Sequence, residues 1–170
     1  EIRPGGERDE YVVVTTAAPE TSDNRRAIGS DSFANSTRRE AITAARDSGE
    51  TRITAKLKLV MDSGNAPPAF LMYQAVYRNG ELPASVDDRR IKIAGYFVSA
   101  FRVDALIAAV VGGRHRDIAI RVYDGFDRRD ENLYFASHPD QSFLDTRHSL
   151  SATVDVGGRS WLVEYAALPE

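Results

Sequence analysis

The feature that most constrains the fold is the apolar segment AFLMYQAVY at residues 69–77. Apolar side chains occupy both its odd and its even positions, which is typical of a central strand that is covered on both faces. A second strong segment, IKIAGYFVSAF at residues 91–101, follows after a charged loop at residues 79–90. Both segments predict strands, and the first is expected at the centre of a sheet.

Further strands are predicted before and after these two. They are YVVVTTA at 11–17, TRITAKLKLVM at 51–61, IAIRVY at 118–123, LYFAS at 133–137, and a hairpin of LSATVDV and WLVEYAA around Gly157 and Gly158. A helix is expected at 37–48, where Thr37 and Glu40 have capping-box spacing and Gly49 follows. A short buried helix, VDALIAAVV, is expected at 103–111. Strands broken by two short helices predict an α+β fold, with an antiparallel sheet of about five or six strands and flanking helices.

The composition limits the classes of function. A chain of 170 residues corresponds to one domain, in which polar residues 1–10 are expected to be a disordered lead before the folded part at 11–167. The net charge of −3 argues against nucleic-acid binding. The absence of cysteine excludes a disulfide, a cysteine zinc site and a thiol nucleophile.

Motifs for catalysis, metal ions or cofactors are not found in the sequence. The three histidines lack metal-ligand spacing, and no GxSxG, P-loop or GxGxxG motif occurs. We therefore predict no catalytic residue, no metal site and no cofactor. The longest apolar run, at 105–111, is far shorter than the roughly 20 residues that a membrane span needs.

Several segments between residues 27 and 137 resemble, in order, the CHASE family of sensory domains. They are IGSDSFANSTRREAITAARDSGETRIT, FLMYQAVY, GYFVSAFRVDALI, IAIRVYDG and LYFAS, and the later GRSWLVEY resembles the family's last strand. The family occurs in histidine kinases, diguanylate cyclases and plant cytokinin receptors. The resemblance implies a PAS-like sheet over residues 11–167. We expect this chain to be the membrane-distal lobe of such a domain, excised from its stalk helix and transmembrane parts.

This resemblance also implies a function. We expect a periplasmic, extracytoplasmic sensor of a small molecule, in an inner-membrane receptor of the histidine kinase or cyclic-di-GMP cyclase type. The sensor itself would not be an enzyme. The full-length receptor would dimerise through the stalk, and the excised lobe would be monomeric. Two alternatives stay open: a ligand-free dimerisation or structural module with a packed centre, and a small soluble hydrolase or transferase with a cleft of titratable groups.

Arg38 and Arg39 are the most informative candidates for ligand binding. Both fall in the first turn of the expected helix, where the helix dipole disfavours a cation. An anionic ligand would compensate, held by the guanidinium and the free N–H groups of the helix. Alternatively, the arginine pairs with Asp31 or Asp23, or is solvated.

Three other candidates come from the family resemblance, and a fourth comes from strand parity. In the plant receptors an acidic residue that reads the adenine ring falls on Arg38, so the reversed charge argues for an organic anion rather than an adenine-type ligand. Val60, Tyr73 and Tyr96 fall on ligand-contacting or pocket-lining positions. Val98 shares the parity of Tyr96 and is expected on the same face. The alternative for these residues is ordinary core packing.

Overall fold

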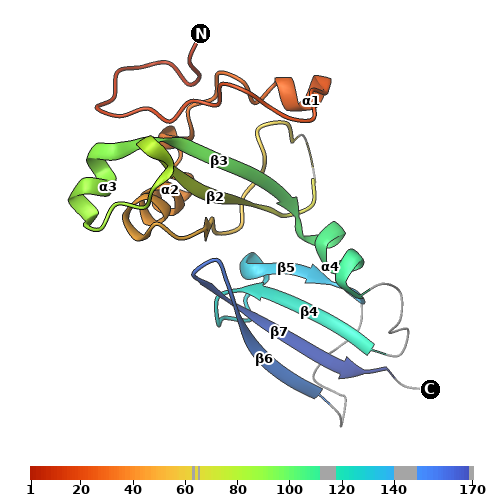
Figure 1. The fold of residues 1–170 in the computed structure, drawn as a ribbon. Coiled ribbons are helices and arrows are strands. Elements are labelled where there is room, and N and C mark those ends of the chain that lie inside the picture. Colours follow the sequence, from red (N-terminus) through yellow and green to blue (C-terminus); the bar gives the residue numbers. More distant parts are fainter. Residues whose placement is uncertain (63, 65, 112–117, 140–148, 169–170) are drawn as a thin grey trace.

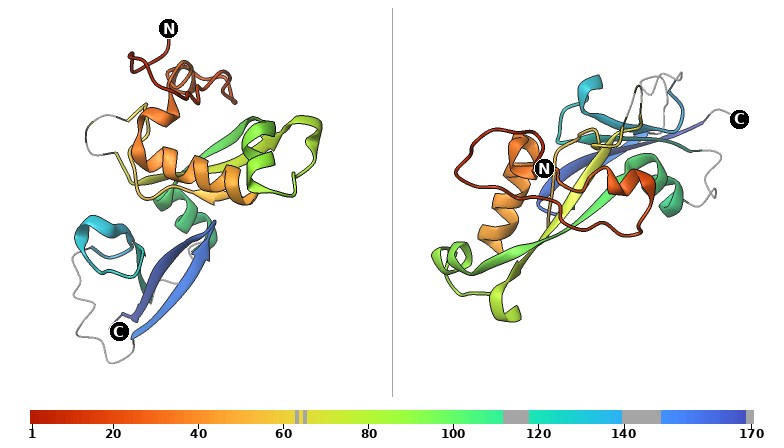
Figure 2. Two further views of the ribbon diagram at one scale, coloured as in Figure 1. Left: turned by 90° about the vertical axis from the view of Figure 1, so that its left-hand side faces the viewer. Right: turned by 90° about the horizontal axis from the view of Figure 1, so that it is seen from above.

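The computed structural model describes residues 1–62, 64, 66–111, 118–139 and 149–168, and they form an α+β fold with antiparallel sheets (Figure 1). This confirms the predicted fold class. The described strands make two sheets rather than one sheet of five or six strands. One has the order β1-β2-β3 and the other β5-β4-β7-β6. The two sheets lie one below the other in Figure 1 and in the left view of Figure 2, with the N-terminal segment at the far end from the second sheet.

The described elements have the following bounds. The strands are β1 (Arg52–Ile53), β2 (Ala69–Tyr77), β3 (Ile93–Arg102), β4 (Ile118–Asp124), β5 (Leu133–Ala136), β6 (Ser149–Val156) and β7 (Arg159–Ala167). The α-helices are α1 (Ser22–Arg25), α2 (Ser36–Ser48), α3 (Val86–Lys92) and α4 (Val103–Val111). Short 3-10 turns are η1 (Ser32–Ala34), η2 (Arg78–Gly80) and η3 (Asp130–Asn132).

The first sheet is built on β2, which lies between β1 and β3 as the sequence predicts for a central strand. Tyr73 of β2 pairs with Val98 of β3 in the antiparallel register. Helix α2 packs on one face of this sheet. Its buried residues form a cluster with side chains of β2, and the members are Phe33, Ala41, Ile42, Ala45, Leu71 and Tyr73.

Helix α2 begins one residue earlier than expected, because Asn35 is its N-cap. The Asn35 side-chain oxygen accepts a hydrogen bond from the backbone nitrogen of Arg38 at 3.0 Å, so the predicted cap at Thr37 is wrong. The helix ends at Gly49, whose φ of 75° lies in the left-handed region that glycine adopts without strain. The C-terminal prediction is therefore confirmed.

A second core joins the two sheets. Its buried residues come from both sheets and from the first residue of α4, and they are Ile53, Phe70, Val103, Ile120, Val122, Tyr134 and Trp161. The Phe70 ring stacks on Phe101 and meets the edge of Trp161, in both cases with centroids 5.2 Å apart. Helix α4 was predicted to be buried, but only Val103 is, and the Val110 side chain is 75% exposed. The β6–β7 hairpin around Gly157 and Gly158 is confirmed.

The segment at 11–17 is not a full strand, contrary to the prediction. It forms one antiparallel bridge, between Val13 and Asp31, with Val14 hydrogen-bonded to Ser30 and Gly29. The first ten residues, expected to be a disordered lead, lie along the same loop. The backbone nitrogen of Arg3 donates to the Gly29 oxygen at 2.8 Å. Backbone pairing with residues 29–31 thus holds both segments in place.

Two predictions in the middle of the chain are also wrong. The strand expected at 51–61 is limited to Arg52–Ile53 and an isolated bridge at Leu57, since the Thr54 hydroxyl accepts from the Leu71 nitrogen and interrupts the ladder. The loop expected at 79–90 contains the start of α3, which Ser85 caps by accepting from the Asp88 nitrogen at 3.1 Å. The sequence also predicts a polar connection at residues 137–147, between the strand at 133–137 and the hairpin, and most of it lies outside the described residues.

Candidate functional site

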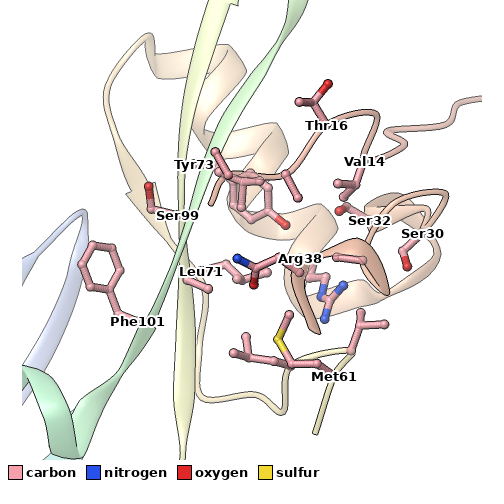
Figure 3. A pocket seen from close by; sticks show the side chains of 18 of the residues that line it. Val14, Thr16, Ser30, Ser32, Arg38, Met61, Leu71, Tyr73, Ser99 and Phe101 are labelled. Atoms are coloured by element: carbon pink, nitrogen blue, oxygen red, sulfur yellow. The ribbon is translucent and has the colours of Figure 1, made fainter. Parts of the chain in front are cut away.

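A pocket of about 510 Å³ lies where the N-terminal segment and the first turn of α2 meet the first sheet (Figure 3). Its walls come from residues 14–19, the loop after α1, residues 59–61, β2 and β3. This volume is within the range of small-molecule sites in proteins. The pocket brings together four of the predicted site residues, Arg38, Val60, Tyr73 and Val98.

Tyr73 forms the floor of the pocket. Its side chain is 1% exposed, and its hydroxyl points toward the side of the pocket where Ser32 and Arg38 lie (Figure 3). Within the described part of the chain, no hydrogen bond of normal geometry satisfies this hydroxyl. Burial raises the pKa of Tyr73, while Ser32 and the positive charge of Arg38 oppose that shift. The phenol is therefore protonated at neutral pH and is a free donor for a ligand oxygen.

Arg38 supplies the positive charge. The N-cap at Asn35 sets the first turn of α2, and from there the Arg38 side chain reaches into the pocket. Its Nε is buried without a hydrogen bond, and no carboxylate among the described residues pairs with it. The proposed alternative partner Asp31 is engaged elsewhere, since its carboxylate accepts from Val12 and Phe33 nitrogens and pairs with Arg8 at 3.3 Å.

Two predicted site residues do not line this pocket. Arg39 is exposed, and among the described residues its guanidinium reaches the Phe33 carbonyl oxygen alone, at 3.5 Å. Tyr96 packs instead against the buried cluster of α2 and β2. Desolvation raises the pKa of Tyr96 to about 12, and its buried hydroxyl has no hydrogen bond to another described residue. Val60 and Val98 are 40% and 41% exposed, so they form the rim of the pocket.

Several residues that line the pocket were not predicted from the sequence. Asn24, Ser30 and Ser32 line the pocket, and none of them was among the predicted site residues. Residues 16–19 form a further wall. Their place depends on the backbone bonds between residues 12–14 and 29–32, which a local pattern does not reveal.

The described residues offer few groups for catalysis or metal binding at this pocket. The described residues contain no group of three or more metal-ligating side chains, and Arg38 is the one charged residue that lines the pocket there. No helix in the described ranges combines the length and the apolar character of a membrane span. What the arrangement offers is a cation and neutral donors beside apolar walls, which suits the binding of a ligand.

A comparison with protein families identifies the kind of domain. The CHASE domain family matches residues 1–135 of the chain. The chain belongs to the CHASE domain family. CHASE domains are extracellular sensory domains, so this one is a sensory signalling domain.

One curated relative of this CHASE domain is a signalling protein. It is the hybrid signal transduction histidine kinase A of Dictyostelium discoideum, which is 24% identical over 184 residues. The match covers 94% of the chain but spans only 8% of the length of that kinase.

Proposed function

We propose that this CHASE domain is the extracytoplasmic, periplasmic sensor of a transmembrane receptor, and that its ligand is a small organic anion bound at Arg38. The observation that carries this proposal is the pocket, in which Arg38 has no acidic partner and the Tyr73 hydroxyl has no hydrogen bond within the described chain. Arg38 is half-buried with its Nε fully buried, and the Tyr73 hydroxyl is buried. Leaving these groups unsatisfied costs free energy, and an anion would remove both costs.

The pocket favours sensing over the two other functions considered. A ligand-free structural module would have side chains packed where this pocket lies. A hydrolase or transferase would need several converging titratable groups, whereas the described pocket residues contribute Arg38 and Tyr73. The domain itself would therefore bind its ligand without transforming it, and any enzymatic output would belong to a cytoplasmic part of the receptor.

Transmission of the signal would use the contacts between the pocket and the second sheet. Residues 59–61 form one pocket wall, and the same segment begins at Lys56, which contacts β5 and Asp124. A ligand shifts the equilibrium only if it prefers one arrangement of these parts. We propose that the receptor is of the histidine kinase or cyclic-di-GMP cyclase type, that it dimerises as a full-length protein, and that the isolated domain is monomeric.

Two experiments test this proposal. The first is a thermal-shift screen with acetate, succinate, citrate and phenylacetate, on the unsubstituted chain, Arg38→Gln and the matched control Arg39→Gln. At least one anion should raise the melting temperature of the unsubstituted chain and of Arg39→Gln, and not of Arg38→Gln. No stabilisation by any anion, or equal shifts in all three proteins, would contradict binding at Arg38.

The second experiment tests the location. Alkaline phosphatase, which is active only outside the cytoplasm, would be inserted into the exposed loop at Asn79 of the full-length receptor. Phosphatase activity in intact cells is the expected result. An inactive fusion, in a receptor that is present at the normal level, would place the domain in the cytoplasm.

A further inference from the structure

The single positive charge of the pocket limits how many negative charges a ligand can carry. Of the described residues that line the pocket, Arg38 alone is charged, and the other polar groups are neutral hydroxyls and amides. By contrast, Arg102 pairs with the Asp62 carboxylate and Arg159 pairs with the Asp124 carboxylate. Arg38 is thus a single uncompensated charge.

We infer that the ligand is a monocarboxylate with an apolar body, such as an arylacetate or a medium-chain fatty acid. This inference rests on the proposed function and names the chemical class that the same pocket accepts. One carboxylate matches the one guanidinium, and the remaining surface of the pocket matches an apolar body.

The anchor for the carboxylate would consist of Arg38 and Tyr73. The Arg38 side chain and the Tyr73 hydroxyl reach the pocket from α2 and β2, and Ser32 lies beside them (Figure 3). A carboxylate has two oxygens and accepts several hydrogen bonds, so one oxygen can accept from the guanidinium and the other from the phenol. Tyr73 is 1% exposed, so a donor of this kind is available only to a group inside the pocket.

The rest of the lining is predominantly apolar. Leu71 on β2 is 7% exposed, and side chains from the segment at residues 59–61 and from β3 face the same space. The residues that would contact an apolar body are Leu59, Met61, Leu71 and Val98. Contact with such side chains releases water from an apolar ligand and contributes to affinity in proportion to the buried area.

A second negative charge would have no cationic partner among the described residues that line the pocket. A dicarboxylate or a phosphate ester would have to bury the additional charge against these apolar walls, and an unpaired buried charge is strongly disfavoured. Dicarboxylates and phosphate esters should therefore bind more weakly than a monocarboxylate of similar size. A neutral ligand of the same shape would leave Arg38 unsatisfied and should also bind more weakly.

Isothermal titration calorimetry with five probes tests this inference on the purified chain. The probes are phenylacetate, hexanoate, acetate, succinate and 2-phenylethanol, which vary the charge and the apolar body separately. Phenylacetate and hexanoate should bind about tenfold or more tightly than acetate, because only they have an apolar body. Phenylacetate should also bind about tenfold more tightly than 2-phenylethanol, which has the same ring without the charge.

Matched variants assign the contacts. Arg38→Gln should lower the affinity for phenylacetate to about that for 2-phenylethanol, and Tyr73→Phe should lower it about threefold to tenfold. Arg39→Gln, one residue away and exposed, should leave the affinity unchanged. The five probes on the unsubstituted chain show by themselves whether the ligand's charge and its apolar body contribute to affinity. The inference can therefore be tested even if a variant does not fold.

The outcomes separate this inference from the proposed function. If succinate binds more tightly than phenylacetate, or acetate binds as tightly as phenylacetate, the inference of a monocarboxylate with an apolar body is wrong. The proposal that the domain senses an anion is then still supported. If 2-phenylethanol binds as tightly as phenylacetate, the charge has no role, and both are wrong. If no probe binds, both are wrong as well.

Discussion

The backbone nitrogen of Lys56 donates a hydrogen bond to the Asp124 carboxylate at 3.1 Å, and this contact links the chain that leads to the pocket with the second sheet. The other oxygen of Asp124 accepts from Arg159 at 2.9 and 3.0 Å. The Lys56 ammonium extends the link, because it donates to the backbone oxygens of Glu131 and Leu133 at 2.7 and 2.9 Å. A short segment thus joins a pocket wall to the second sheet.

Replacing Lys56 by methionine removes the two ammonium hydrogen bonds and keeps most of the apolar stem. We expect Lys56→Met to lower the free energy of unfolding by about 1–2 kcal/mol, and to speed amide hydrogen exchange in β5. Urea denaturation and hydrogen exchange measure the two effects. Lys58→Met is the matched control, since its exposed ammonium reaches only the Gly64 oxygen at 3.2 Å, and its effect should be below about 0.5 kcal/mol. Equal effects of the two substitutions would show that Lys56 does not link the sheets.

Replacing Gly157 by alanine should disturb the contact between the β6–β7 turn and β1. The Gly157 φ is 54°, and a Cβ there would lie 2.8 Å from the Ile53 Cγ2 atom. The backbone oxygen of Gly157 also accepts from the Ile53 nitrogen at 3.1 Å. Gly157→Ala should therefore cost about 2–4 kcal/mol of stability, from backbone strain and overpacking together.

Gly80→Ala separates strain from overpacking. The Gly80 φ is 75°, but nothing lies within 4 Å of its added Cβ, so the cost should be about 1 kcal/mol. Thermal and urea unfolding of both variants give the comparison. A cost at Gly157 no larger than that at Gly80 would mean that the turn moves away from Ile53 freely.

Two phenylalanines on neighbouring strands should differ sharply in their contribution to stability. Phe70 is 1% exposed and packs on Phe101 and Trp161, so Phe70→Ala should cost about 3–5 kcal/mol. Phe97 lies on β3 with its side chain 73% exposed, so Phe97→Ala should change stability by less than about 0.5 kcal/mol. Urea denaturation measures both values. A small cost at Phe70 would show that the two sheets do not share the core described here.

Local patterns predicted the elements whose hydrogen bonds are local or whose apolar runs are long. Strands β2 and β3, helix α2 and the hairpin at Gly157 are of this kind. Strand β1 was predicted too long because its end depends on a distant contact, the one between Thr54 and Leu71. The division into two sheets was missed for the same reason, since it depends on which apolar surfaces meet.

Four of the six candidate site residues line the pocket. Arg38 and Tyr73 line the pocket, whereas Arg39 does not, because successive residues of a helix point about 100° apart and only one of two neighbours can face the pocket. The polar wall at Asn24, Ser30 and Ser32 was missed, since hydrogen bonds to distant segments place it. Among the lining residues that were not predicted, Leu71 lies on the regular strand β2, and its pocket-facing role is not distinguishable from core packing in the sequence.

The ion pair of Asp62 and Arg102 predicts how stability depends on pH. The Asp62 side chain is 3% exposed, and it accepts from the Leu59 nitrogen at 2.7 Å besides pairing with Arg102. The hydrogen bond from Arg102, followed by that from Leu59, lowers the pKa of Asp62 below 3.8 against the opposing effect of burial. A carboxyl with a lowered pKa stabilises the fold above its unfolded pKa, and the contribution is lost as the pH falls through the folded value.

Asp62→Asn should therefore reduce the free energy of unfolding by about 2 kcal/mol at pH 7, and by progressively less as the pH falls below about 4. Urea denaturation at pH 7, 5, 4 and 3 measures the difference between the two proteins.

The exposed Asp9, which has no ion pair in the part of the chain described, provides the control. Asp9→Asn should leave stability within about 0.5 kcal/mol at each pH. Asp47 also has a pKa lowered by Arg90, so the Asp62→Asn protein should still lose some stability in acid. A difference at Asp62 that stays constant from pH 7 to pH 3 would show that its charge does not hold the pocket segment to β3.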